Sequence, residues 1–329
     1  MTPIVKRRPL SDIYALIEKD LKFFNERLKK ELSSEDELIR GIHSHLLSMT
    51  GKFLRPALAL FCSRIENEEH PEATDMAVAI ELIHTATLVH DDIIDDSDLR
   101  RNQPSVYSKW GKEISIVAGD YLYAKAFLLL AGLGDVKINQ AFASCAHLMC
   151  EGEMKQIEKR ADFLMEESEY LKIIHQKTAA LFQAACVGGA YYAGTSLPNI
   201  EKLGHYGYCL GMAFQIVDDC LDLTADSESL GKKAGLDVTK NDVTLPVLYL
   251  FQDLGSAQRQ ELLEDLRQNG EGAFERVRQL VRQHGSIEKA AEKAAYYTEK
   301  ALEDLSEISE SRAKQSLVAL AHYSFERLR

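Results

Sequence analysis

The spacing of apolar residues is the feature that most constrains the fold of this chain. Apolar side chains recur at three- and four-residue intervals almost throughout, as in LIEKDLKFFNERLKKEL and AAEKAAYYTEKALEDL. This is the period of an amphipathic α-helix, whereas a half-buried strand alternates at every second residue. No sustained alternation and no Asn-Gly hairpin signal occurs, and no proline falls between Pro104 and Pro198. The sequence therefore predicts an all-α protein.

The breaks between helical stretches carry Ser, Asp, Gly and Pro, and they leave about a dozen helices, several of roughly 20 residues or more. No low-complexity linker or shift of composition divides the chain. With 329 residues, 46% of them apolar, the chain is long enough to bury a large core. We therefore expect a single domain over residues 1–329, with an N-terminal helical region at 1–35.

The charge and the apolar runs limit the possible partners and compartment. A net charge of −12 argues against nonspecific binding of nucleic acid, and it allows an anionic substrate only where cations are placed locally. The cysteines form no CxxC pair, as expected in a reducing cytosol. No apolar segment of a secretory signal follows the N-terminal basic residues, and the run near LFQAACVGGAYYAG is shorter than the roughly 20 residues of a membrane span. We expect a soluble cytoplasmic protein without a transmembrane segment, and peripheral membrane contact stays open.

An aspartate cluster, DDIID, closes the apolar stretch AVAIELIHTATLVH. On a helix, Asp91, Asp92 and Asp95 would point roughly the same way. Like charges at this spacing repel each other, and a helix C-terminus disfavours negative charge. A solvated helix end is the simplest interpretation of one such cluster. The alternative is a site for Mg²⁺, which prefers oxygen ligands and bridges carboxylates to substrate phosphates.

The second cluster, in FQIVDDCLD, repeats the pattern with Asp218, Asp219 and Asp222. It also ends an apolar stretch, and two copies are far more specific than one. If the two helices lie side by side, six carboxylates face one cleft. Such a cleft would be destabilising without metal, whereas with roughly three Mg²⁺ it would bind a diphosphate.

Basic residues flank both clusters and two other segments. Each of them alone is typical of a solvated surface, but together they would bind two anionic head groups, one through Mg²⁺ and one directly. They are Arg100 and Arg101 after the first cluster, Lys232 after the second, Lys177 in HQKTAALF, and Lys52 and Arg55 in TGKFLRPAL.

These motifs resemble those of the trans-prenyl diphosphate synthases, also called polyprenyl synthetases. The segments GKFLRP, ELIHTATLVHDDIIDDSDLRR, AGDYL, KTA, FQIVDDCLD, LGKKAGLD and TLP occur in that family's order, from about Lys52 to the C-terminus. The resemblance implies an all-α bundle around a deep apolar cavity, usually dimeric. It implies a prenyltransferase that condenses isopentenyl diphosphate with an allylic diphosphate by ionisation, condensation and elimination, using about three Mg²⁺ that Mn²⁺ can replace.

The resemblance also implies a role for each matching residue. The metal ligands would be Asp91, Asp92, Asp95, Asp218, Asp219 and Asp222. The allylic diphosphate would be held by Arg100, Lys177 and Lys232. Isopentenyl diphosphate would be held by Gly51, Lys52, Arg55, His84 and Arg101. Thr178 and Gln215 would face the developing cation and complete the catalytic set with the aspartates and Lys177.

Three positions depart from the family's pattern. Thr50 replaces the first of two glycines, and RRNQPS replaces the usual RRGxPT, so that the turn after the arginines can differ. Many members carry a lysine, and long-chain members often an asparagine, two residues before the Thr of TLP. This chain carries Asp242 there, with Lys240 close by. An acid there would weaken binding of the allylic diphosphate unless it points to solvent and Lys240 serves instead.

Product length is expected to depend on the residues one turn before Asp91. Bulky aromatics there close the cavity in short-chain members, whereas this chain has Ala86 and Thr87. The resemblance therefore implies a long product, about C30 to C50 and about C40 as a single value, of the kind used for quinone side chains. Tyr123 or Phe127 would form the floor.

The same resemblance leaves other functions open. The chain could be a short-chain synthase for farnesyl or geranylgeranyl diphosphate, or the catalytic subunit of a heteromeric heptaprenyl synthase with a small partner subunit. A class I terpene cyclase shares the fold, but its second metal motif typically mixes Asn, Ser or Thr, and Glu. A non-catalytic regulatory subunit usually lacks the aspartates.

Overall fold

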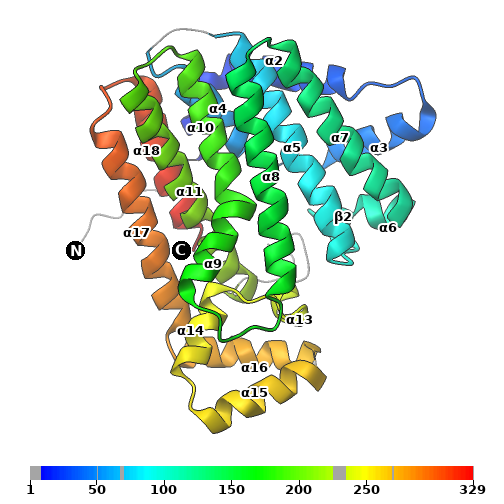
Figure 1. The fold of residues 1–329 in the computed structure, drawn as a ribbon, viewed down its shortest axis with the longest axis vertical. Helices are drawn as coiled ribbons and strands as arrows, with labels where there is room; N and C mark the ends of the chain where they lie inside the picture. Colours follow the sequence, from blue (N-terminus) through cyan, green and yellow to red (C-terminus); the bar gives the residue numbers. More distant parts are fainter. Residues whose placement is uncertain (1–8, 50, 67–69, 225–234, 269, 329) are drawn as a thin grey trace.

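Helices make up most of the described protein. The computed structural model describes residues 9–49, 51–66, 70–224, 235–268 and 270–328. Within these ranges the predicted all-α fold is confirmed (Figure 1). Several helices are as long as the sequence predicted. The five that exceed 20 residues are α5 (Glu72–Ile94), α7 (Lys112–Gly132), α8 (Val136–Glu158), α11 (Leu197–Thr224) and α17 (Ser286–Ser306).

Shorter helices surround these long ones. At the N-terminal end, α2 packs against α5 and α1 packs against α18, while α15 and α16 lie together at one end of the molecule (Figure 1). In chain order the shorter helices are α1 (Leu10–Tyr14), η1 (Ala15–Ile17), α2 (Glu18–Glu31), α3 (Glu37–Ser48), α4 (Leu54–Ser63), α6 (Val106–Trp110), α9 (Glu167–Ile174), η2 (His175–Ala179), α10 (Ala180–Tyr192), α13 (Leu236–Thr239), α14 (Leu245–Asp253), α15 (Ser256–Gln268), α16 (Gly270–Gln283), α18 (Arg312–Phe325) and η3 (Glu326–Leu328).

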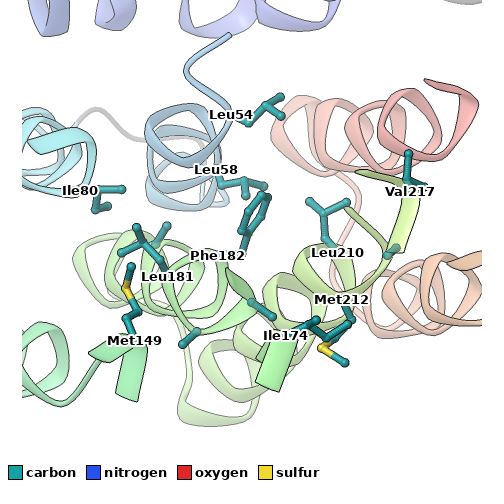
Figure 2. Packing of buried hydrophobic residues seen from close by; sticks show 14 of the residues in the cluster. Leu54, Leu58, Ile80, Met149, Ile174, Leu181, Phe182, Leu210, Met212 and Val217 are labelled. Carbon is teal, nitrogen blue, oxygen red and sulfur yellow. The ribbon is translucent and has the colours of Figure 1, made fainter. Parts of the chain in front are cut away.

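Helix α10 lies between α4 and α11 and joins them into one core. Figure 2 shows Phe182 of α10 pointing into the space between Leu58 of α4 and Leu210 of α11. Phe182 is fully buried, and burial of such a side chain contributes about 1.5–3 kcal/mol. The guanidinium of Arg55 on α4 lies 4.5 Å from the centre of the Phe182 ring. The same packing that stabilises the core therefore also positions a candidate substrate-binding cation.

The segment η2 is a π-helical stretch between α9 and α10. It packs against α8 at Gly152, where an added Cβ would lie 2.6 Å from the backbone nitrogen of Lys177. Only a glycine permits this close approach. Single π-helical turns within α-helices are frequent at functional sites, and this one carries Lys177 and Thr178.

The sequence did not predict a short β-hairpin whose two strands have two residues each. Strand β1 (Leu99–Arg100) pairs antiparallel with β2 (Gln103–Pro104), and the turn residues Arg101 and Asn102 have φ of 53° and 61°. A turn with two positive φ values is the usual connection of a two-residue hairpin and favours Asn or Gly. Asn102 therefore supplies the left-handed conformation where the family's pattern has glycine.

Helix α7 is long and apolar enough to cross a membrane, with a mean hydropathy of 1.5. The sequence pointed to a different apolar run, near LFQAACVGGAYYAG, and predicted no membrane span. In the structure α7 packs along α5, and 28% of its most apolar window is buried. The core helix of a soluble protein has the same length and composition, so α7 is weak evidence for a membrane span.

Candidate active site

A cavity of about 1320 Å³ collects residues from nearly every segment that the motifs singled out. Its walls come from the segment before α4, from α5, the hairpin, α8, α9, η2, α11 and the segment before α14. Of the residues predicted from the sequence, it is lined by Gly51, Lys52, Arg55, His84, Thr87, Asp91, Asp95, Arg100, Arg101, Tyr123, Lys177, Thr178, Gln215, Asp218, Asp219 and Asp242. Lys232 lies outside the described residues.

The first aspartate cluster is divided between the cavity and the protein interior. Asp91 and Asp95 line the cavity, while Asp92 is only 3% exposed and accepts hydrogen bonds from Arg100 at 2.9 Å and 2.5 Å. The expectation that all three point the same way is therefore wrong for Asp92. Successive helical residues are separated by about 100° around the axis, so the neighbour of Asp91 faces elsewhere. Burial raises the pKa of Asp92, although Arg100 opposes this shift.

The second cluster lies at the C-terminal end of α11. Asp218 and Asp219 line the cavity, whereas Asp222 is 1% exposed and is not part of the wall. The Tyr170 hydroxyl and the Gln215 amide donate hydrogen bonds to Asp219 at 2.5 Å and 2.8 Å. Burial, followed by the nearby charge of Asp237, raises the pKa of Asp219 to about 7.

The side chains around the cavity fit a hard divalent cation. Asp91, Asp95 and Asp218 present carboxylates on its wall, and Asp219 lies beside Asp218. Such an oxygen-only set suits Mg²⁺ or Ca²⁺ rather than a metal that prefers sulfur or imidazole.

Lys177 and Thr178 lie on the π-helical turn and line the same cavity as these carboxylates. Lys177 forms an ion pair of 2.5 Å with Glu153 of α8, and Thr178 donates a hydrogen bond of 2.8 Å to Gln215. Burial disfavours the charged form of Lys177, but Asp91 and Glu153 outweigh burial and raise its pKa. Lys177 therefore stays positively charged beside the first cluster.

A second group of cations lies at the start of α4. Arg55 is partly buried, and burial lowers its pKa to about 10. Its guanidinium lies 3.1 Å from Nε2 of His84 on α5. Burial and then the charge of Arg55 lower the pKa of His84 well below its usual range, so His84 is neutral and accepts this bond. These contacts join two predicted head-group ligands into one unit.

Lys52, Gly51 and Arg101 complete this group. The Lys52 ammonium lies 5.5 Å from the centre of the Tyr323 ring, and the Tyr14 hydroxyl donates to the Lys52 carbonyl at 2.8 Å. Arg101 donates a hydrogen bond to the carbonyl of Met49, and its guanidinium packs where a side chain at Gly51 would have to lie. Glycine at position 51 thus leaves room for Arg101.

Of the two arrangements expected for Asp242, the one in which it points to solvent is wrong. It lines the cavity and is 5% exposed, so it does not point to solvent. Nε of Arg160 donates to its carboxylate at 2.8 Å. Lys240 instead forms an ion pair of 3.2 Å with Asp95.

The two positions expected to control product length differ in their surroundings. Thr87 lines the cavity, whereas Ala86 is fully buried and is not part of the wall. Tyr123 of α7 also lines the cavity, but Phe127 does not. The neighbouring wall is apolar at Met149, Met154, Ile157, Ile173 and Ile174.

Sequence reasoning missed several residues that contact the predicted ones. Tyr170 bonds Asp219, Glu153 pairs with Lys177, Arg160 pairs with Asp242, and Arg327 pairs with Asp218 at 2.7 Å. The C-terminal HYSFERLR carried the only hint of Arg327, because it ends the region of resemblance. The other three stand in segments whose composition is ordinary for a helix or loop.

Comparison with known proteins identifies the class of this site. A family model described as "Polyprenyl synthetase" matches residues 36–284. The chain therefore belongs to the polyprenyl synthetase family, a family of prenyltransferases. The solved structure of a polyprenyl synthase from Caulobacter crescentus CB15, complexed with calcium and isoprenyl diphosphate, has a TM-score of 0.93 and 33% identity, covering 98% of this chain and 99% of that one.

The curated relatives carry names with different product lengths. An octaprenyl diphosphate synthase of Haemophilus influenzae is 33% identical, covering 97% of each chain. A short chain isoprenyl diphosphate synthase of Methanothermobacter thermautotrophicus is 36% identical, covering 97% of this chain and 99% of the relative. Heptaprenyl diphosphate synthase component 2 of Geobacillus stearothermophilus is 40% identical, covering 74% of this chain and 76% of the relative.

Proposed function

We propose that this protein condenses isopentenyl diphosphate with an allylic diphosphate, using Mg²⁺, and releases a long all-trans polyprenyl diphosphate of about C40. The observation that carries this proposal is that aspartates from both clusters and two groups of cations line one cavity. One group, Arg100 and Lys177, lies beside the first cluster. The other group, Lys52, Arg55 and Arg101, lies at the start of α4 and at the hairpin.

The residues of the cavity have distinct tasks in this reaction. Bound Mg²⁺, roughly three ions, would be held by Asp91, Asp95 and Asp218 and would neutralise the charge of the leaving diphosphate. Asp92 orients Arg100, and Asp219 is held by Tyr170 and Gln215. These contacts keep the charged groups in place before substrate arrives, which lowers the reorganisation needed during ionisation.

The ionised allylic chain must then be protected from water. Lys177 and Arg100 hold the diphosphate, while the oxygens of Thr178 and Gln215 face the developing cation. The double bond of isopentenyl diphosphate attacks C1 of the allylic cation and forms the new C–C bond. A proton then leaves to the departing diphosphate, and this regenerates a double bond. No nucleophilic side chain takes part, and the apolar wall excludes water from the cation.

The growing chain is expected to pass Thr87, because that side chain stands on the wall of the cavity one turn before Asp91. A small residue there leaves the path open toward Tyr123 and the methionines of α8. The names of the octaprenyl and heptaprenyl relatives support a long product. The name of the Methanothermobacter relative supports the short-chain alternative.

We further propose that the protein is a cytoplasmic homodimer that associates through α7. This helix exposes Val117 (64%) and Leu128 (69%), and Ile116 and Tyr121 are also exposed. A second copy would cover this apolar face. The likeness to a component 2 supports an additional small partner subunit as an alternative. Light scattering of the wild type and of Leu128→Glu measures self-association, and a monomeric wild type would refute the homodimer.

Product analysis tests the proposed reaction. The purified chain is incubated with Mg²⁺, labelled isopentenyl diphosphate and geranyl, farnesyl or geranylgeranyl diphosphate, and chain length is read by chromatography. We expect a polyprenyl ladder that ends near C40. A C15 or C20 product would favour the short-chain alternative, a cyclic hydrocarbon would favour a terpene cyclase, and activity that requires an added subunit would favour the heteromeric enzyme.

A further inference from the structure

The acid at position 242 is neutralised inside the protein. Asp242 stands on the cavity wall and is 5% exposed. Its Oδ1 accepts a hydrogen bond of 2.8 Å from Nε of Arg160, whose side chain is 26% exposed. Such a charge-assisted contact is stronger than one between neutral groups. The pairing joins residues 82 positions apart, so neither segment shows it in the sequence.

The backbone next to this ion pair ties the same two segments together. The nitrogen of Ala161 donates to the carbonyl of Asn241 at 2.8 Å. Both residues have positive φ, 61° and 59°, a conformation that costs free energy for residues other than glycine and is found mostly where the surrounding structure imposes it. The nitrogen of Asp242 is bonded in turn to the carbonyl of Asp237 at 2.8 Å. Arg160 and Asp242 are therefore presented to each other by fixed backbone.

Arg160 also reaches the first aspartate cluster. Its Nη2 lies 3.3 Å from Oδ1 of Asp95, and the Lys240 ammonium lies 3.2 Å from the same oxygen. Asp95 and Asp242 both line the cavity, and Arg160 bridges them. A guanidinium has five N–H donors, and these two contacts use two of them. Donors therefore remain for a phosphate oxygen.

The charges at this corner of the cavity add up in a simple way. Arg160 and Lys240 each carry one positive charge, and Asp242 and Asp95 each carry one negative charge, so the four groups cancel. If a bound metal takes over the charge of Asp95, a single net positive charge is left for a phosphate. The guanidinium of Arg160 stays charged because arginine is not deprotonated in proteins.

We propose that Arg160, held in place by Asp242, supplies together with Lys240 the positive charge that binds the diphosphate of the allylic substrate beside Asp95. This inference rests on the proposed function and assigns a binding role that the sequence motifs did not reveal. Asp242 is a positioning residue in it. The departure from lysine at position 242 is thus compensated by an arginine from the segment between α8 and α9.

Direct binding tests this assignment separately from turnover. Isothermal titration with Mg²⁺ measures the affinity for geranyl S-thiolodiphosphate, an allylic analogue whose C–S bond resists ionisation, and for isopentenyl diphosphate. Arg160→Ala is expected to weaken binding of the allylic analogue about tenfold to a hundredfold and binding of isopentenyl diphosphate less than about threefold. Lys155→Ala removes a cation of α8 that pairs with Glu158 at 2.7 Å and is a matched control. It should change neither affinity.

Two second-site variants distinguish a binding role from a structural one. In the Arg160→Ala background, Asp242→Asn removes the uncompensated acid, and Asp242→Lys returns a cation to this corner. Both should recover much of the lost affinity for the allylic analogue, and Asp242→Lys should recover more. Neither change restores the bond between residues 160 and 242. A merely structural role predicts equal recovery in both variants and for both ligands, because each variant removes the unpaired acid, whereas a binding role predicts greater recovery with Asp242→Lys for the allylic analogue alone. Asp242→Asn alone should weaken binding less than about threefold, because Arg160 keeps its charge.

The possible outcomes separate this inference from the proposed function. If Arg160→Ala leaves the affinity for the allylic analogue unchanged, or weakens binding of both ligands equally with equal or no recovery in the two double variants, Arg160 is not a ligand of the allylic diphosphate. That result would leave the proposed function standing, provided that the wild type binds both ligands and forms product. A wild type that binds neither ligand would overturn both.

Discussion

The guanidinium of Arg327 lies 2.7 Å from the carboxylate of Asp218 and 4.8 Å from the centre of the Phe214 ring. The C-terminal turn η3 thereby packs against α11 at the second aspartate cluster. The ion pair joins one of the last residues of the chain to a predicted metal ligand. Arg327 and a cation at Asp218 must therefore compete for that carboxylate.

Removal of this competitor should change the dependence on metal. Arg327→Ala is expected to lower the Mg²⁺ concentration for half-maximal activity by about two- to fivefold, since a partly exposed ion pair contributes about 0.2–1 kcal/mol. Arg327→Lys keeps the charge and should behave like the wild type. A titration of activity against Mg²⁺ measures both. An unchanged midpoint in Arg327→Ala would show that the ion pair does not oppose metal binding.

The carboxylates on the cavity wall should be essential for turnover. Asp91→Asn and Asp218→Asn are each expected to lower kcat by several orders of magnitude while circular dichroism and thermal unfolding stay close to those of the wild type, because each change removes a charge that metal requires. Asp98→Asn, an exposed position just beyond the first cluster, is the matched control. Chelation of divalent metal should abolish activity. Near-normal turnover of either cluster variant would remove that carboxylate from the metal site.

Substitutions in the two groups of cations should affect KM for different substrates. Lys52→Ala is expected to raise KM for isopentenyl diphosphate about ten- to a hundredfold, and Lys177→Ala should do the same for the allylic primer, because each loses a charge-assisted contact. Arg55→Ala should act like Lys52→Ala but should also lower stability, because the Arg55 guanidinium packs on the ring of Phe182. Steady-state kinetics with each substrate varied in turn gives KM for isopentenyl diphosphate and for the allylic primer in both Lys52→Ala and Lys177→Ala. Equal effects on both substrates would contradict the assignment.

A bulky substitution at Thr87 should shorten the product, whereas the same substitution at Ala86 should mainly lower stability. Thr87→Phe places a ring on the cavity wall and should shorten the product to about C15 or C20 with turnover retained. Ala86 is fully buried, so Ala86→Phe overfills the core and is expected to cost about 1–3 kcal/mol of stability. Chromatography of the products and thermal unfolding of both variants provide the comparison. A full-length product from Thr87→Phe would show that the chain grows along another path.

The buried carboxyl of Glu81 should make stability depend on pH. Burial raises its pKa to about 7, above the value in the unfolded chain. Between pH 4.5 and 7 the folded state therefore binds more protons than the unfolded state, and stability falls as pH rises through this window. Glu81→Gln cannot titrate, so its stability relative to the wild type should increase by about 2–3 kcal/mol from pH 5 to pH 8. Denaturant unfolding at both pH values tests this, and a constant difference would contradict it.

The sequence alone was sufficient for the properties that depend on local chemistry. The three- and four-residue spacing predicted long helices, and these are present in α5, α8 and α11. The doubled aspartates and the basic motifs identified the family and most of the cavity's charged lining, because each motif carries its residue types in a short segment. A local pattern is enough where the chemistry of one segment requires particular side chains at a particular spacing.

Only the tertiary structure decided which way the side chains point and which distant residues meet. The carboxylate of Asp92 bonds to Arg100 and is not part of the cavity wall. Thr87 lines the wall, whereas Ala86 does not. The direction of these side chains depends on which side of α5 packs against other helices. Asp242 is neutralised by Arg160 across 82 positions of sequence. Contacts of this kind leave no periodic signal, since they result from the packing of whole helices, and a sequence without coordinates cannot pair them.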